Sequence, residues 1–344
     1  MNAPRSTPLH EPPTETAARA AVPPADPHPR EPRSLLFARI ALPLLLVLLV
    51  VVFSILAPST FATIDNLKTV LNLQAVLTIL AIGLLLPLIV GELDLSVAAN
   101  LGLGLILVTG LTSQQGVPVY LAIVIAVAAC TLVGVVNGLL VTKVGINSFI
   151  VTIGMSTVLT GVIGAYTLGN VFYENIPVEL TSLGKGDLFG IPLPVVYAAI
   201  VAIVVAYVLT MTPIGRFLYA IGGSKDAARL SGVPVARLTI GAFAGAGALA
   251  GIAGVVQAGI LGSGNPTVGP PFLLPAFAAA YLGATAISPG TFNVWGTVIA
   301  VVTLQVGTTG LALLGAPFWL EPIFTGVALI GAVAATRYLR KEAL

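Results

Sequence analysis

Ten long apolar stretches dominate this chain of 344 residues and limit what it can fold into. Each is close to the roughly 20 residues that a helix needs to cross the hydrocarbon core of a bilayer. Hydrophobic residues make up 57% of the sequence and charged residues 8%, against about a quarter charged in an ordinary soluble domain. The sequence therefore predicts an all-α polytopic membrane protein with about ten transmembrane helices. The expected spans are residues 40–57, 69–90, 95–112, 118–142, 148–168, 192–211, 238–262, 272–288, 293–313 and 318–336.

Positive charges are distributed very unevenly over this arrangement. With the N-terminus inside and ten spans, thirteen of the fifteen Lys and Arg residues fall on the inner side, and only Lys68 and Lys185 fall outside. Cytoplasmic loops of membrane proteins carry such an excess. We therefore expect both termini to be cytoplasmic, with a basic inner loop at 212–237 and a long outer loop at 169–191.

The N-terminal segment, residues 1–34, differs from the rest of the chain. It contains nine prolines and no apolar periodicity. Such a stretch cannot bury enough surface to offset its ordering entropy. We expect a disordered, Pro-rich cytoplasmic tail, followed by a single transmembrane domain over 35–344.

Side chains for catalysis or metal binding are almost missing from the sequence. The single cysteine, Cys130, lies in an apolar run, and the two histidines, His10 and His28, lie in the tail. We therefore expect no catalytic centre, metal site or cofactor, and a membrane enzyme is the remotest alternative. The net charge of +2 gives no reason to expect nucleic acid as a partner. No G-x-x-x-x-G-K-[S/T] phosphate loop occurs, so any ATP-driven process needs a separate polypeptide.

The inner loop contains the signals of a short helix with both ends capped. Ser224 is a good N-cap, and Asp226 places a negative charge in the first turn. Arg229 suits the last turn, Gly232 suits a left-handed C′ position, and Pro234 prevents continuation. A stiff element of about two turns is able to dock on a partner and transmit a push. From the residues alone, a surface turn that merely links two spans is an equal interpretation.

Several motifs, in this order, carry a family resemblance that covers nearly everything after the tail. They are Gly91-Glu92-Leu93-Asp94-Leu95-Ser96-Val97, Asn137-Gly138-Leu139-Leu140-Val141, Phe149-Ile150-Val151-Thr152-Ile153-Gly154, Gly161, and the stretch 215–234 with Ala227-Ala228-Arg229-Leu230-Ser231-Gly232. Through them the chain resembles the permeases of ribose- and xylose-type ATP-binding-cassette importers, which are related to the branched-chain amino acid permeases. Two places depart from the family pattern. Glu92 stands where the family usually has Gly, and residues 272–277 replace an acidic Glu-Leu-Asp-Ala stretch.

The resemblance implies a function and a set of partners. It implies that residues 35–344 form a permease domain in the bacterial inner membrane that passes a small neutral solute of the monosaccharide class. The implied partners are cytoplasmic ATPase subunits, a periplasmic sugar-binding protein and a second permease chain, identical or related, within membrane lipid. The implied ATPase-coupling helix comprises Ser224, Lys225, Asp226, Ala227, Ala228, Arg229, Leu230, Ser231 and Gly232. Bulky substitutions at Ala228 or Gly232 are then expected to uncouple transport from ATP hydrolysis.

Polar residues at membrane depth are candidates for a solute pathway. Gly91, Asp94 and Ser96 suit a broken-helix hinge beside the pathway, although Asp94 also suits a simple cap for the helix that begins near Leu95. Each other candidate has the alternative role of an interhelical hydrogen bond. These candidates are Asn72, Gln74, Asn100, Asn137, Gln257, Asn265 and Gln305.

One predicted span carries a small-residue face with overlapping G-x-x-x-G spacings. It consists of Gly241, Gly245, Gly247, Gly251 and Gly254. In lipid such faces allow helices to approach closely, so packing is the expected role.

An ion-coupled secondary transporter is the competing function. Proton coupling normally needs ionisable groups inside the membrane, and Glu92, Asp94 and Glu321 lie near the predicted span ends. Sodium coupling is less firmly excluded, because carbonyl and hydroxyl oxygens also bind that ion.

Overall fold

The computed structural model describes residues 33–342. The predicted tail lies outside these residues, except that Arg33 and Ser34 begin the first helix. Nearly all of the described chain is helical. The elements are α1 Arg33–Leu56, α2 Ile64–Ile89, α3 Val97–Ser113, α4 Val119–Leu139, the π-helix η1 Leu140–Val144, α5 Ser148–Thr167, α6 Val178–Lys185, β1 Asp187–Leu188, β2 Ile191–Pro192, α7 Leu193–Met211, α8 Pro213–Gly223, α9 Lys225–Leu230, α10 Val235–Leu261, the 3-10 helix η2 Pro270–Phe272, α11 Leu273–Gly283, α12 Val294–Leu313 and α13 Leu320–Glu342.

Every predicted span corresponds to a helix, which confirms the all-α polytopic fold class. Among the described residues, eight helices are long and apolar enough to cross a membrane. The other two predicted spans are shorter: α3 has 17 residues, and α11 ends at Gly283 although the sequence predicted a span to 288. Gly283 packs directly on Gly296 of α12, and an irregular turn follows it.

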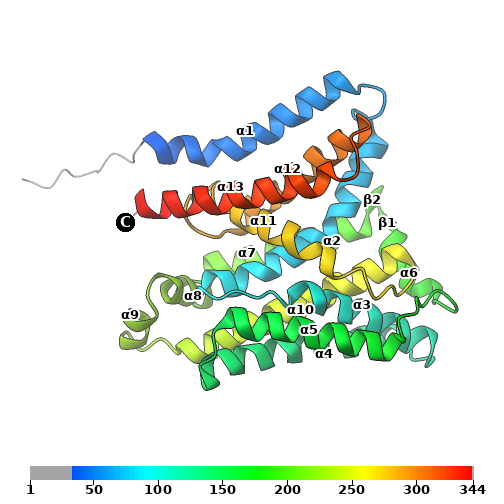
Figure 1. The fold of residues 1–344 in the computed structure, drawn as a ribbon, viewed down its shortest axis with the longest axis horizontal. Helices are drawn as coiled ribbons and strands as arrows, with labels where there is room; N and C mark the ends of the chain where they lie inside the picture. The colour runs from blue at the N-terminus through cyan, green and yellow to red at the C-terminus, as the bar shows by residue number, and fades with distance from the viewer. Residues whose placement is uncertain (1–32, 343–344) are drawn as a thin grey trace, which may run out of the picture.

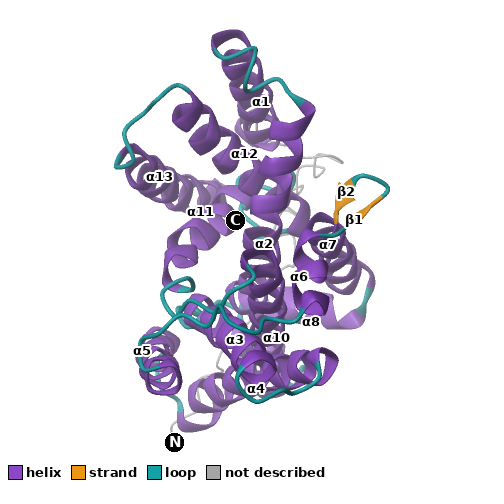
Figure 2. Ribbon diagram, turned by 90° about the vertical axis from the view of Figure 1, so that its right-hand side faces the viewer, coloured by secondary structure: helices purple, strands orange, loops and turns teal. Residues whose placement is uncertain are grey.

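Two helices, α2 and α10, form the centre of the protein. Their most apolar windows are 67% and 61% buried, against 11% for those of α1 and α13. Figure 2 shows α1, α12 and α13 on one side of α2 and α3, α4 and α5 on the other. The small-residue face predicted for α10 explains this central position, because α10 contacts α2, α3 and α4 closely.

Four of the five α10 glycines confirm the packing prediction. A Cβ at Gly247 would overlap the Cys130 carbonyl oxygen, and one at Gly254 would overlap the Leu101 carbonyl oxygen. Gly251 and Gly245 also meet neighbouring side chains. Gly241 meets nothing within 4 Å, so the prediction was wrong at that position.

The two shortened spans, α3 and α11, each follow a stretch of irregular chain that runs along other helices. After α2, residues 91–96 run inward before α3 begins (Figure 1). After α10, the chain follows α3: Gly264 packs on Thr109, and a Cβ at Gly269 would lie 3.1 Å from the Cα of Gly102. Irregular backbone at membrane depth is tolerated where protein covers it.

The two ends of the helical bundle carry different short elements. Figure 1 shows α8 and α9 at the same end as the start of α1 and the end of α13, with α6, β1 and β2 at the other end. This arrangement agrees with an even number of crossings. The sequence predicted one short helix in the inner loop and missed α8, which begins with Pro213 at a favourable first helical position.

Candidate functional site

The short helix α9 has the predicted caps. The Ala227 N–H donates to Ser224 Oγ at 3.2 Å, and Asp226 lies in the first turn. At the other end, the Val233 N–H donates to the Ala228 carbonyl at 3.0 Å, and Gly232 has a φ of 81°. These bonds satisfy the backbone groups that a helix leaves open at its ends, so α9 is a defined element rather than a flexible turn.

One side chain of α9 is turned inward and another outward. Ala228 is 5% exposed and belongs to the main apolar core. Leu230 is 91% exposed, an unusual position for a large apolar residue on a six-residue surface helix. A partner that covers Leu230 would remove this apolar surface from water.

Three contacts fix the α8–α9 element against the membrane helices. Lys225 of α9 forms an ion pair with Glu92, which follows α2. A Cβ at Gly222 would overlap the carbonyl oxygen of Ile89, so α8 approaches the last turn of α2 backbone to backbone. The Tyr219 hydroxyl donates to the Phe292 carbonyl at 2.7 Å, just before α12. Burial raises the pKa of the Tyr219 hydroxyl, so it stays protonated as a donor.

We expect the Glu92–Lys225 ion pair to contribute about 1 kcal/mol or less to the free energy of unfolding, because Lys225 is 45% exposed. A double-mutant cycle with Glu92→Gln and Lys225→Gln measures this coupling in denaturant or thermal unfolding. The coupling should shrink in about 1 M salt. Lys143→Gln removes a positive charge elsewhere on the inner side and serves as the control; strictly additive effects of the two changes would rule the coupling out.

A cluster of buried polar groups holds the break between α2 and α3. We call Asp94, Ser96, Asn137, Ser148 and Thr152 the break cluster; all are at most 6% exposed. The Asp94 carboxylate accepts from the Ser96 N–H at 3.0 Å and from its hydroxyl at 2.6 Å. Asn137 Nδ2 donates to Ser96 Oγ at 2.9 Å. The N-cap position of α3 is Ser96, which makes no side-chain cap bond, and Asp94 lies two residues before it. Asp94 therefore stabilises the turn that leads into α3, and its role as a pathway hinge stays a prediction.

Two hydroxyls of α5 complete the cluster. Ser148 Oγ accepts from the Leu93 N–H at 3.2 Å, and Thr152 Oγ1 accepts from the Leu95 N–H at 3.0 Å. Neither residue was predicted as a site residue, although Thr152 lies in one of the motifs that carry the family resemblance. Their spacing of four places both hydroxyls on one face of a helix, and this is the sequence signal that groups them.

The remaining polar candidates separate into different roles. Asn100 Nδ2 donates to the Cys130 carbonyl at 3.0 Å, and the Cys130 thiol donates to the Asn100 carbonyl at 3.3 Å. Asn100 therefore joins α3 to α4. Asn265 accepts from the Thr267 N–H and hydroxyl within its own turn, both at 2.9 Å. Asn72 and Gln257 are half-buried, in α2 and α10, and belong neither to the break cluster nor to the cavity described next.

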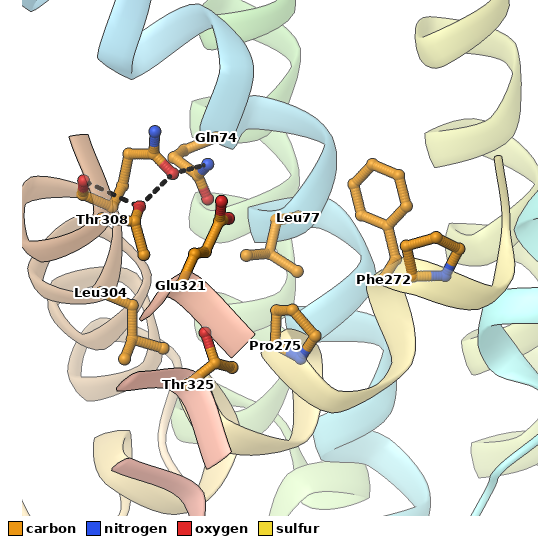
Figure 3. Close-up of a pocket in the computed structure, with 10 residues that line it drawn as sticks. Gln74, Leu77, Phe272, Pro275, Leu304, Thr308, Glu321 and Thr325 are labelled. Atoms are coloured by element: carbon orange, nitrogen blue, oxygen red, sulfur yellow. Dashed lines mark hydrogen bonds between the residues drawn. The ribbon is translucent and has the colours of Figure 1, made fainter. Parts of the chain in front are cut away.

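Gln74 and Gln305, from opposite ends of the sequence, meet at a cavity. Gln74 Nε2 donates to Gln305 Oε1, and Gln305 Nε2 donates to Thr309 Oγ1 at 2.7 Å. The cavity has a volume of about 190 Å³ and lies between α2, α11, α12 and α13 (Figure 3). It is lined by Gln74, Leu77, Pro271, Phe272, Pro275, Leu304, Gln305, Thr308, Glu321 and Thr325.

The wall of this cavity includes part of residues 272–277, where the chain departs from the family pattern. Phe272 and Pro275 line the wall opposite the two amides. Figure 3 shows the Glu321 carboxylate pointing toward Gln74. Gln74 and Gln305 were predicted as pathway candidates from the sequence, whereas Glu321 was noted only as an ionisable residue near a span end, and Thr308 and Thr325 were missed.

A polytopic helical bundle with two interrupted crossings, a polar cavity and a capped helix at one end has the architecture of a membrane permease. Comparison with known protein families agrees with this architecture. The model of the family described as "Branched-chain amino acid transport system / permease component" matches residues 66–333, and the chain belongs to this family.

Three curated relatives share most of their length with this chain. The ribose import permease protein RbsC of Haemophilus influenzae is 32% identical over 303 residues, which cover 87% of this chain and 93% of that protein. RbsC of Escherichia coli K12 is 34% identical over 296 residues, 84% of this chain and 90% of that protein. The D-allose transport system permease protein AlsC of Escherichia coli K12 is 30% identical over 298 residues, which cover 86% of this chain and 91% of that protein. No solved structure matches the chain.

Proposed function

We propose that this chain is the permease subunit of an ATP-binding-cassette importer and passes a neutral solute of the monosaccharide class across the bacterial inner membrane. The names of the relatives support this proposal, since they describe permeases for ribose import and D-allose transport. These names do not favour an ion-coupled secondary transporter. ATP hydrolysis belongs to a separate cytoplasmic subunit in this proposal.

The observation that carries the proposal is the α9 helix with its exposed Leu230. A defined helix with an apolar side chain 91% exposed fits a groove on an ATPase subunit. We assign residues 224–232 as the coupling helix on this basis. The positive charges of 212–237 support a cytoplasmic position for this helix.

The contacts of α8 and α9 suggest how a push at α9 reaches the membrane. Lys225 pairs with Glu92, two residues before Asp94 of the break cluster, and Gly222 packs on the last residue of α2, Ile89. Tyr219 holds the start of α12, which contributes Gln305 to the polar cavity. A rigid displacement of α8 and α9 therefore acts on both polar sites.

The other proposed partners are a periplasmic sugar-binding protein and a second permease chain. The outer end offers α6 and the β1–β2 hairpin as a docking surface, with three acidic side chains in the loop 169–191: Glu174, Glu179 and Asp187. If the second permease chain is identical to this one, the pair presents two copies of this docking surface to the binding protein. If it is a related chain, the two docking surfaces differ.

The proposal is tested by affinity purification of the full chain from its native membrane, followed by mass spectrometry of the proteins recovered with it. We expect a cytoplasmic ATPase and a secreted binding protein. We also expect the chain purified alone to bind no ATP, because its sequence has no phosphate loop. Recovery of the chain alone, active in liposomes under an ion gradient, would establish a secondary transporter instead.

A further inference from the structure

The cavity between α2, α11, α12 and α13 combines the chemical groups that recognise hydroxyls. The Gln74 and Gln305 amides each offer donors and acceptors, and Thr308 and Thr325 each offer a hydroxyl. Glu321 adds a carboxylate, which accepts hydrogen bonds from neighbouring hydroxyls of one solute. Phe272 and Leu77 add apolar surface on the opposite side (Figure 3).

The position of Glu321 argues for a water-filled cavity rather than a lipid-facing surface. Glu321 lies in the first turn of α13 and is exposed. A negative charge is favourable at a helix N-terminus, and this alone explains why a carboxylate is tolerated there. It does not explain the direction of the side chain, which points toward the Gln74 amide (Figure 3). A carboxylate directed at lipid would be costly, so water or a solute must face it.

The depth of the two amides agrees with a position on a solute pathway. Gln74 lies five residues after the start of the predicted span 69–90, and Gln305 lies eight residues before the end of the predicted span 293–313. At about 1.5 Å per residue, they lie about 8 Å and about 12 Å below the outer ends of these spans. A hydrocarbon core is about 30 Å thick, so both amides lie within its outer half.

The charge of the lining restricts the solute. Among the ten described lining residues, Glu321 is the one charged residue. A phosphate or carboxylate group on the solute would face this negative charge with no cation from the lining to compensate it. The volume, about 190 Å³, is below the roughly 300 Å³ or more of pockets for drug-sized ligands, which suits one sugar ring.

We infer that this cavity is a solute-binding site on the pathway, in which Glu321 accepts hydrogen bonds from a neutral polyhydroxylated solute and excludes anionic ones such as sugar phosphates. The inference rests on the proposed function and adds a site and a charge selectivity to it. Gln74, Gln305, Thr308 and Thr325 orient the solute beside the carboxylate.

Cysteine labelling tests the site without any partner protein. The only cysteine, Cys130, is 0% exposed, so the unmodified chain gives an unlabelled background. Thr325→Cys is introduced into the full chain in nanodiscs and treated with two methanethiosulfonate reagents of similar size, one cationic and one anionic. We expect the cationic reagent to react about tenfold faster, because a unit charge a few Å away is worth about 1 kcal/mol even in water and acts with opposite sign on the two reagents. Adding Glu321→Gln should remove most of this preference.

Controls and protection complete the experiment. Gln114→Cys, in an exposed loop after α3, should show no preference that depends on Glu321. D-ribose, D-xylose, D-allose and D-glucose are tested as protecting probes, and we expect at least one to slow labelling at Thr325→Cys several-fold. D-ribose 5-phosphate should not protect, and Glu321→Gln should weaken the sugar protection.

Several outcomes would overturn the inference. These are equal reagent preference with and without Glu321, protection by the sugar phosphate as strong as by any sugar, or protection by none of the four sugars. Thr308→Cys provides a second reporter if Thr325→Cys does not fold, and two folded reporters that do not label would show that the cavity is closed to water. Failure of the proposed function gives a different result, because labelling needs no ATPase, whereas co-purification does.

Discussion

Gly247→Val is expected to destabilise the protein by about 3 kcal/mol, which is the upper part of the usual range for overpacking. The added Cβ would overlap the carbonyl oxygen of Cys130, at the contact between α10 and α4. A backbone group cannot rotate away as a side chain does, so the two helices must separate. Because α10 also contacts α2 and α3, the whole centre of the bundle loses packing. The midpoint of thermal unfolding in detergent, followed by size-exclusion chromatography, measures the effect.

Gly241→Val is the matched control for this prediction. It changes the same residue type on the same helix, but a Cβ at Gly241 meets nothing within 4 Å. We expect its unfolding midpoint to stay close to that of the unmodified chain. If both variants unfold at the same temperature, then close backbone approach does not determine the stability of α10.

Leu230→Glu is expected to weaken binding of the ATPase subunit at least tenfold and to reduce solute transport to a similar degree. Leu230 is 91% exposed, so the change should leave the unfolding midpoint of the isolated chain unchanged. In the complex, the new carboxylate would be desolvated in an apolar groove, which costs at least the 1.4 kcal/mol of a tenfold change. Pull-down of the ATPase and ATP-dependent uptake in proteoliposomes are the measurements.

Leu188→Glu provides the control, because Leu188 is an exposed leucine in β1 at the opposite end of the protein. It should leave ATPase binding intact. Ala228→Trp is a second, harsher variant: Ala228 is 5% exposed, so a bulky side chain must displace α9. We expect Ala228→Trp to retain the membrane helices but to uncouple ATP hydrolysis from transport. Normal solute uptake by both Leu230→Glu and Ala228→Trp would show that α9 is not the coupling helix.

The sequence predicted most of the fold because the signals involved are local. A long apolar run specifies a membrane helix by length alone, which is why all ten predicted spans are helical. The caps of α9 were also predictable, since Ser224 and Gly232 act on backbone groups only three or four residues away. The short length of α11 was harder to predict, because it depends on the contact between Gly283 and Gly296 of the next helix.

The polar cavity shows what local signals leave out. Gln74 and Gln305 are 231 residues apart, and each alone resembles an ordinary interhelical hydrogen-bonding residue. Glu321 lies near the start of its helix, and only the packing of α13 against α11 and α12 turns it toward the amides. Polar residue type therefore indicated candidates, whereas their grouping required the tertiary structure.

The hydrogen bonds between α5 and the break have a mechanical consequence. Leu93 and Leu95 have backbone N–H groups that the α5 hydroxyls satisfy, and sheltered donors left without partners cost about 1–3 kcal/mol each. Sliding α5 away from residues 91–96 would therefore carry an energetic penalty at two points at once. We therefore expect the inner end of α5 and residues 91–96 to move together in the proposed transport cycle, with any relative motion along another helix boundary.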